Sequence, residues 1–181
     1  MKRIVNVLSK LNWGTRACAV LVLCATTAIA LPAQTLTTLY TFCSQTGCPD
    51  GDGPHAGLVQ ATNGDLYGTT WGGGVNGQGT VFKITQGGTL TTLYSFCSQT
   101  NCTDGDGPIA GLVQAANGDF FGTTSSGGAN GGGTVFKITP SGTLTTLYSF
   151  CSQTNCADGG APDAVLVQVV LGRAFRPQYR R

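Results

Sequence analysis

The chain repeats itself with a period of 54 residues, and this period limits its fold more than any other feature of the sequence. Residues 35–88 and 89–142 differ at 13 positions, and a third copy begins at Thr143. The period is marked by cysteines that recur at this spacing, in the series Cys43, Cys97 and Cys151 and the series Cys48, Cys102 and Cys156. A period of this length predicts stacked supersecondary units rather than one irregular domain.

Four short strands are expected in each copy. In the second copy they are expected over residues 89–96, 110–115, 119–124 and 134–139. The two-residue period of a strand places Leu90, Tyr94 and Phe96 on one face of the first strand. It also places Phe136 and Ile138 on one face of the last.

The turns between these strands are rich in glycine, which accounts for 28 residues, whereas glutamate is absent. Such a composition disfavours helices. Asn117-Gly118 predicts a two-residue hairpin turn in which both residues have positive φ. We therefore expect an all-β protein whose 54-residue repeats each hold about four antiparallel strands, like a β-propeller blade. A β-solenoid or an open β-array is the alternative.

The N-terminal residues have the features of a secretory signal peptide. Basic and polar residues over 1–16 precede an apolar run over 17–31, and Ala30 and Ala33 are the candidate cleavage positions. The run is shorter than the roughly 20 residues that span a bilayer comfortably. We expect a secreted or envelope-associated bacterial protein with no membrane span after cleavage, and an uncleaved anchor is the alternative.

The period and the leader together predict the organisation of the chain. The expected segments are a signal peptide over 1–33, repeats over 34–88 and 89–142, a partial repeat over 143–168 and a divergent Arg-rich tail over 169–181. After Gln168 the third copy loses the Asn-Gly turn and the two strands that should follow. This break suggests a truncated or frameshifted fragment of a longer repeat protein.

Charge argues against nucleic acid as a partner. Between the leader and the tail, the only basic residues besides His55 are Lys83 and Lys137, against eight aspartates. A nucleic-acid-binding domain is expected to carry a basic stripe on its folded body. Two or so blade-like units also leave strand edges and apolar faces uncovered, so self-association is expected.

The six cysteines of the repeats are disulfide candidates because export places them in an oxidising compartment. Each copy holds a C-x4-C pair, and a local bridge that shapes the loop is expected, with pairing between copies as the alternative. The candidates are Cys43, Cys48, Cys97, Cys102, Cys151 and Cys156. No metal or cofactor is expected, because the spacing is wider than in most zinc sites and His55 is the only histidine.

Two Asp-Gly-Asp-Gly runs are possible calcium sites. Carboxylates at alternate positions can converge on calcium, and here they are Asp50, Asp52, Asp104 and Asp106. The chain lacks a closing glutamate, and the third copy loses one carboxylate. We expect plain turns, with calcium as the lesser alternative.

No catalytic residues can be assigned from the sequence. His55 is replaced by Ile109 in the second copy, and Asp65 recurs as Asp119, which favours a role in a turn. A Ser-His-Asp set or a pair of catalytic carboxylates therefore lacks support.

Several strings recur in an unusual order: G-L-V-Q-A-x-N-G-D-x-x-G-T-T, then G-G-x-x-G-x-G-T-V-F-K-I-T, then L-T-T-L-Y-S-F. From Thr35 to about Gln168 the chain resembles the Gloeo-Verruco (GloVer) tandem-repeat family of exported bacterial proteins. The resemblance implies a repeat architecture and a surface location, and it carries over no catalytic residue.

The function expected from these features is that of an exported β-repeat scaffold whose loops bind a protein or a glycan at the cell surface. Variation between the copies is concentrated in loops, which carry recognition on rigid scaffolds, while most strand residues match. The varying loop residues are His55, Trp71, Gly72, Val75 and Gln78. An extracellular propeller enzyme, such as a glycosidase or lactonase, and a fragment without function are the alternatives.

Overall fold

A computed structural model describes residues 36–167 of the chain. The predicted signal peptide, the Arg-rich tail and Gln168 lie outside the described residues. The chain divides into two units, residues 1–37 and 38–181, and all the strands belong to the second.

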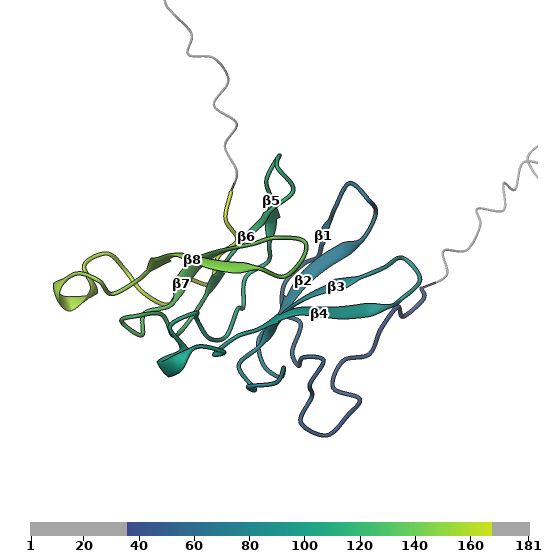
Figure 1. Cartoon of the computed structure of the whole chain (residues 1–181), viewed down its shortest axis with the longest axis horizontal. Coiled ribbons are helices and arrows are strands. Elements are labelled where there is room, and N and C mark those ends of the chain that lie inside the picture. Colours follow the sequence, from purple (N-terminus) through teal and green to yellow (C-terminus); the bar gives the residue numbers. More distant parts are fainter. Residues whose placement is uncertain (1–35, 168–181) are drawn as a thin grey trace, which may run out of the picture. The chain divides into compact units, whose positions relative to one another are not determined.

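Two antiparallel sheets of four strands form the fold, and each runs as a meander in chain order (Figure 1). The first sheet consists of β1 (Val59–Gln60), β2 (Leu66–Thr70), β3 (Thr80–Ile84) and β4 (Leu90–Ser95). The second consists of β5 (Val113–Gln114), β6 (Phe120–Thr124), β7 (Thr134–Ile138) and β8 (Leu144–Ser149). The expected all-β class and the four blade-like strands per period are confirmed.

The sheets are offset from the 54-residue copies that the sequence suggests. β4 lies at the start of the copy 89–142, yet it pairs with β3 of the preceding copy. β8 likewise comes from the partial repeat and pairs with β7. Each sheet therefore takes its fourth strand from the next repeat along the chain.

A bulge in β4 changes which of its side chains share a face. Leu90 lies opposite Ile84 and Tyr94 opposite Val81, because the register shifts at Leu93. Residues opposite each other share a face, and Val81 and Ile84 point to opposite faces because they are three residues apart. Leu90 and Tyr94 therefore lie on different faces, and the prediction that they share one is wrong. The equivalent prediction for β7 holds, since Phe136 and Ile138 are both buried.

The Asn-Gly hairpin is present, but its turn has three residues rather than two. Gly118 N donates to Ala115 O at 2.9 Å, and Ala115 N donates to Asp119 O at 2.9 Å. Gly118 has a φ of 90°, whereas Asn117 does not have a positive φ. This pattern is that of a three-residue hairpin loop in which only the glycine is left-handed. The expected positive φ at both positions is therefore wrong.

The hydrophobic core lies between the two sheets. Tyr67 of β2 stacks on Phe120 of β6, with ring centroids 4.1 Å apart. Phe96, which follows β4, meets Phe136 edge-on with centroids 5.2 Å apart. Each buried aromatic ring contributes about 1.5–3 kcal/mol to the free energy of unfolding. The packing of the two sheets fixes the loops that connect their strands.

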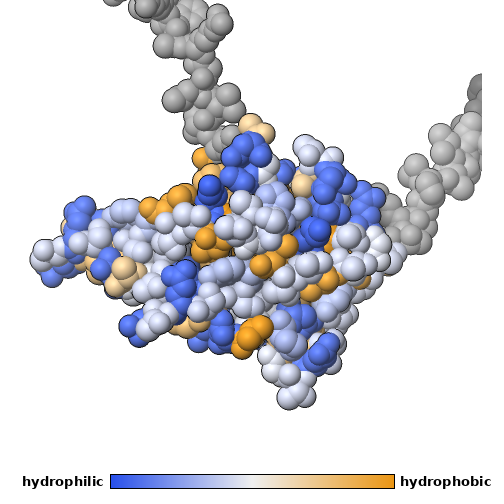
Figure 2. All heavy atoms as spheres, viewed as in Figure 1, coloured by the Kyte–Doolittle hydropathy of each residue, from blue (hydrophilic) through white to orange (hydrophobic). Residues whose placement is uncertain are grey.

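Few large apolar patches mark the surface that Figure 2 shows, where most side chains are drawn white or blue. Among the described residues, no helix has the length and apolar character needed to cross a membrane.

Candidate ligand-binding site

Loops of both sheets enclose a polar hollow of about 190 Å³, which we call the Trp71 pocket. The loop between β2 and β3 belongs to the first sheet, and the loop between β6 and β7 belongs to the second. The connection from β4 to β5, which joins the two sheets, supplies the rest of the lining. The lining residues are Trp71, Gly72, Gly77, Gln78, Asp106, Gly107, Ser125 and Ser126. The pocket is therefore a product of the junction between two repeats.

Backbone hydrogen bonds hold these loops together. Gly107 N donates to Gln78 O of the other sheet at 3.0 Å, and Ser125 N donates to Gly107 O at 3.1 Å. Asp106 and Ser126 exchange two backbone hydrogen bonds, at 2.9 and 3.0 Å. The lining positions are thus fixed by main-chain contacts rather than by the side chains that face the hollow.

Gly107 keeps the pocket open. Its φ of 62° favours glycine, and a Cβ at this position would lie 3.2 Å from Trp71 Nε1 and 3.1 Å from Ser125 Oγ. A larger residue would therefore crowd the space between the indole and the serine.

Trp71 separates this pocket from a second, more open hollow of about 340 Å³ lined by His55, Trp71 and Ile109. The indole is 53% exposed, which leaves about half of its surface available to a ligand. His55 lies edge-on to it, with ring centroids 6.4 Å apart. An extended ligand can therefore contact both hollows across the indole.

Three polar side chains of the Trp71 pocket have free hydrogen-bonding capacity. Ser125 donates its hydroxyl to Gly107 O at 2.8 Å, but no hydrogen bond within residues 36–167 uses the side chains of Asp106, Gln78 or Ser126. Partial burial raises the pKa of the Asp106 carboxyl above its ordinary value. A carboxylate, an amide and a hydroxyl together offer both donors and acceptors.

Positive charge is absent from the lining. Within the described residues the two lysines each lie near an aspartate, Lys83 at 3.9 Å from Asp65 and Lys137 at 3.7 Å from Asp119. Neither lysine lines the Trp71 pocket. An anionic ligand would therefore meet a carboxylate without a compensating cation.

The loop residues that differ between the copies gather at this place. Trp71, Gly72 and Gln78 line the Trp71 pocket, and His55 lines the second hollow. Val75 lies apart from both and is 83% exposed.

Two other lining residues were not expected from the sequence. Asp106 matches Asp52 of the first copy, and the sequence suggested it only as a possible calcium ligand. Ser126 occupies the position of Gly72 in the second copy. A comparison of the copies can detect variation, but it cannot detect which residue of the second copy approaches the first.

Each C-x4-C pair is joined locally. The structure pairs Cys43 with Cys48, Cys97 with Cys102, and Cys151 with Cys156. All six half-cystines have positive φ, between 48° and 61°, a conformation that side chains other than glycine seldom adopt. The disulfide loops are therefore built on an unusual backbone that recurs in all three copies.

An aspartate inside each loop region anchors it. Asp104 is buried and accepts hydrogen bonds from the Tyr94 hydroxyl at 2.8 Å, from Ser98 N at 2.9 Å and from Gln99 N at 3.2 Å. Burial, reinforced by the charge of Asp104, raises the pKa of Tyr94 to about 12. In the third copy, the hydrogen bond from Tyr148 holds the pKa of Asp158 well below its usual range. These carboxylates organise their own loops.

The described residues offer little that could bind a metal ion. One grouping of three possible ligand side chains occurs among the described residues, formed by Cys43, Cys48 and Asp52. Its two sulfurs are joined in a disulfide, so they cannot act as thiolates. Calcium at Asp50, Asp52, Asp104 and Asp106 stays the lesser alternative to the prediction that no metal is bound.

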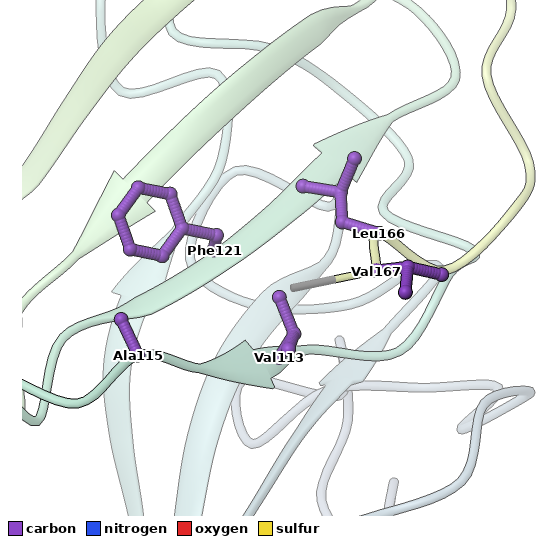
Figure 3. A pocket seen from close by; sticks show the side chains of 5 residues that line it. All are labelled: Val113, Ala115, Phe121, Leu166 and Val167. Carbon is purple, nitrogen blue, oxygen red and sulfur yellow. The ribbon is translucent and has the colours of Figure 1, made fainter. Parts of the chain in front are cut away.

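An apolar pocket of about 350 Å³ lies beside the second sheet. Figure 3 shows Phe121 and Ala115 on one side of it and Leu166 and Val167 on the other, with Val113 below. The lining offers no polar side chain. It therefore lacks the groups that would orient a polar ligand.

Comparison with known proteins relates the chain to a repeat family. A structure of selenomethionine-substituted virginiamycin B lyase from Staphylococcus aureus matches 65% of this chain and 32% of its own, at 14% identity and a TM-score of 0.41. A likeness at that level carries no argument about activity. A search among proteins of curated function found no match. The family model described as the Gloeobacter/Verrucomicrobia repeat matches residues 26–174, and the chain therefore belongs to this repeat family.

Proposed function

We propose that the chain is an exported β-repeat scaffold that binds a protein or a glycan at the cell surface through the loops at the junction of its two sheets. One observation carries the proposal. Four of the 13 positions that differ between near-identical copies come together around Trp71, although they are spread over residues 55–78. Scaffolds that use loops for recognition keep the strands constant and vary the loops in this way.

Two further features support export and an extracytoplasmic location. Three local disulfides are compatible with an oxidising compartment, where such bridges persist. The N-terminal residues have the charge pattern and apolar run of a signal peptide.

A variant that gives the first copy the residues of the second tests the binding proposal. The changes are His55→Ile, Trp71→Ser, Gly72→Ser and Gln78→Gly, all residues that the other repeat already uses at the equivalent positions. We expect this variant to fold and to lose more than tenfold in affinity for the partner captured by the exported wild-type chain.

A matched control carries the same kind of change away from the site, namely Gly47→Asn, Thr62→Ala, Val75→Ala and Gly87→Ser. This control should bind as the wild type does. Retention of the chain in the cytoplasm, or equal binding by wild type and the pocket variant, would contradict the proposal. Cell fractionation with protease accessibility and binding isotherms provide the two readouts.

A further inference from the structure

The lining of the Trp71 pocket indicates which class of ligand the scaffold would accept. Half of the indole surface of Trp71 is exposed, and the Asp106, Gln78 and Ser126 side chains beside it have no hydrogen-bond partner within residues 36–167. A ligand suited to this set needs a flat apolar face and several hydroxyl groups at its rim. A pyranose ring has both, since its C–H groups cover a face and its hydroxyls radiate from the edge.

The size of the pocket supports a single ring. Its volume of about 190 Å³ is smaller than the roughly 300–1,000 Å³ of sites for drug-sized molecules. At roughly 30 Å³ for each water in the liquid, the pocket holds about six waters, which is close to the size of one sugar ring. The second hollow, across Trp71 at His55 and Ile109, provides room for the next ring of a chain.

Charge restricts the class further. The pocket contains the carboxylate of Asp106, and between residues 36 and 167 Lys83 and Lys137 are the only lysines or arginines. Both of them lie near aspartates elsewhere on the sheets. Uronic acids, sulfated sugars and phosphates would bring a negative charge next to Asp106 without a cation to offset it.

We propose that the Trp71 pocket binds one ring of an uncharged oligosaccharide, with Trp71 stacked on the ring and Asp106, Gln78 and Ser126 bound to its hydroxyls. The inference rests on the proposed binding function and specifies its ligand. The third copy offers no second site of this kind, because Ser125 and Gly132 stand where Trp71 and Gln78 are in the first, and Gly160 stands where Asp106 is in the second.

The sequence provides a direct reporter for the test. Trp13 and Trp71 are the only tryptophans, and Trp13 lies within the predicted signal peptide. The emission of the exported, processed chain therefore reports on Trp71 alone. Stacking of a sugar on the indole should shift this emission in a saturable way.

The experiment titrates the full exported chain with neutral gluco-, manno-, galacto- and xylo-oligosaccharides and with oligogalacturonate as the acidic probe. We expect one neutral series to bind, with tighter binding by the disaccharide than by the monosaccharide. Trp71→Ser and Asp106→Asn should each weaken that binding at least tenfold, and Val75→Ala should leave it unchanged. Calorimetry replaces fluorescence for Trp71→Ser, and circular dichroism checks that each variant folds.

Three outcomes would overturn the inference. Neutral-sugar binding that is unaffected by Trp71→Ser would locate the site elsewhere, and preferential binding of oligogalacturonate would assign the pocket to another ligand. The proposed function would survive both results. A lack of binding to every neutral series at millimolar concentration would overturn the inference. The proposed function would fail with it only if no protein partner were captured either.

Discussion

The same five residues, Leu-Thr-Thr-Leu-Tyr, occur at 36–40 and at 90–94, and the two segments differ in structure. The second lies in β4, paired with β3 except at the bulge of Leu93. The first belongs to no strand, and Leu39 within it is 42% exposed. Because the sequences are identical, local preference cannot explain the difference. Strand formation here depends on an adjacent β3, which the segment 36–40 does not have among the described residues.

Replacing the buried phenylalanine of β3 and β7 should give the largest difference between the two contexts. Phe136 is fully buried and packs against Phe96 in the core, whereas Phe82 packs against Phe42, which follows the unpaired segment. We expect Phe136→Ala to lower the free energy of unfolding by about 3–5 kcal/mol and Phe82→Ala by less. Urea denaturation measures both values. Equal losses would mean that the unpaired segment supports its neighbour as well as a paired strand does.

Proline scanning tests the difference in pairing itself. Thr91 and Thr92 lie in β4, and the N–H groups of consecutive strand residues point to opposite sides. One of Thr91→Pro and Thr92→Pro must therefore remove a ladder hydrogen bond, at a cost of about 1–3 kcal/mol. Thr37→Pro and Thr38→Pro should change stability by less than about 0.5 kcal/mol. A large loss in the first segment would show that it pairs in solution.

A threonine pair extends the comparison to the packing between repeats. Thr69 donates its hydroxyl to Ala110 O at 3.0 Å, across the junction of the sheets. The equivalent Thr123 hydroxyl is buried without a hydrogen-bond partner among the described residues. Thr69→Val should cost about 1–3 kcal/mol because it leaves a buried carbonyl unpaired, and Thr123→Val should be neutral or stabilising. Thermal unfolding of the two variants measures these costs. A loss of stability in Thr123→Val would show that the Thr123 hydroxyl does have a hydrogen-bond partner.

The smallest effect is expected in the ionisation of tyrosine. The pKa of Tyr94 is raised to about 12, and the hydrogen bond from Tyr40 to Asp50 raises the pKa of Tyr40 as well. A raised pKa means that the stabilising contribution is complete below the unfolded value of about 10 and is lost as pH rises through the folded value. Absorbance titration should show one late phenol that is missing in Tyr94→Phe. Loss of the late phase in Tyr40→Phe instead would assign that ionisation to Tyr40, and would contradict the prediction for Tyr94.

Much of this fold could be predicted from residue type and spacing alone. The strands over 90–95, 120–124 and 134–138 lie within the expected ranges, because each run is rich in threonine and apolar residues and lies between Gly-rich turns. The bulge at Leu93 could not be predicted, since an extra residue in one strand is visible only against its partner. The turn at Asn117-Gly118 was identified by residue type, but the hydrogen bonds of Ala115 decide its length.

The candidate site was predictable in part, for a similar reason. Trp71 and Gln78 stand out because the second copy lacks them. Asp106 does not stand out, because the first copy has the same residue at the same place. Its approach to Trp71 depends on how one sheet meets the next, and this information is spread over the whole core.

The offset between sheets and repeats bears on how such genes can grow. Duplicating any 54-residue window, in whatever phase, creates a junction with the same sequence as the junctions already present. The third strand of each sheet then still pairs with a strand from the next unit, as β3 pairs with β4 and β7 with β8 here. Recombination between repeats can therefore change the number of units without designing a new contact. A difference such as that between Trp71 in one unit and Ser125 in the next can afterwards make one junction unlike another.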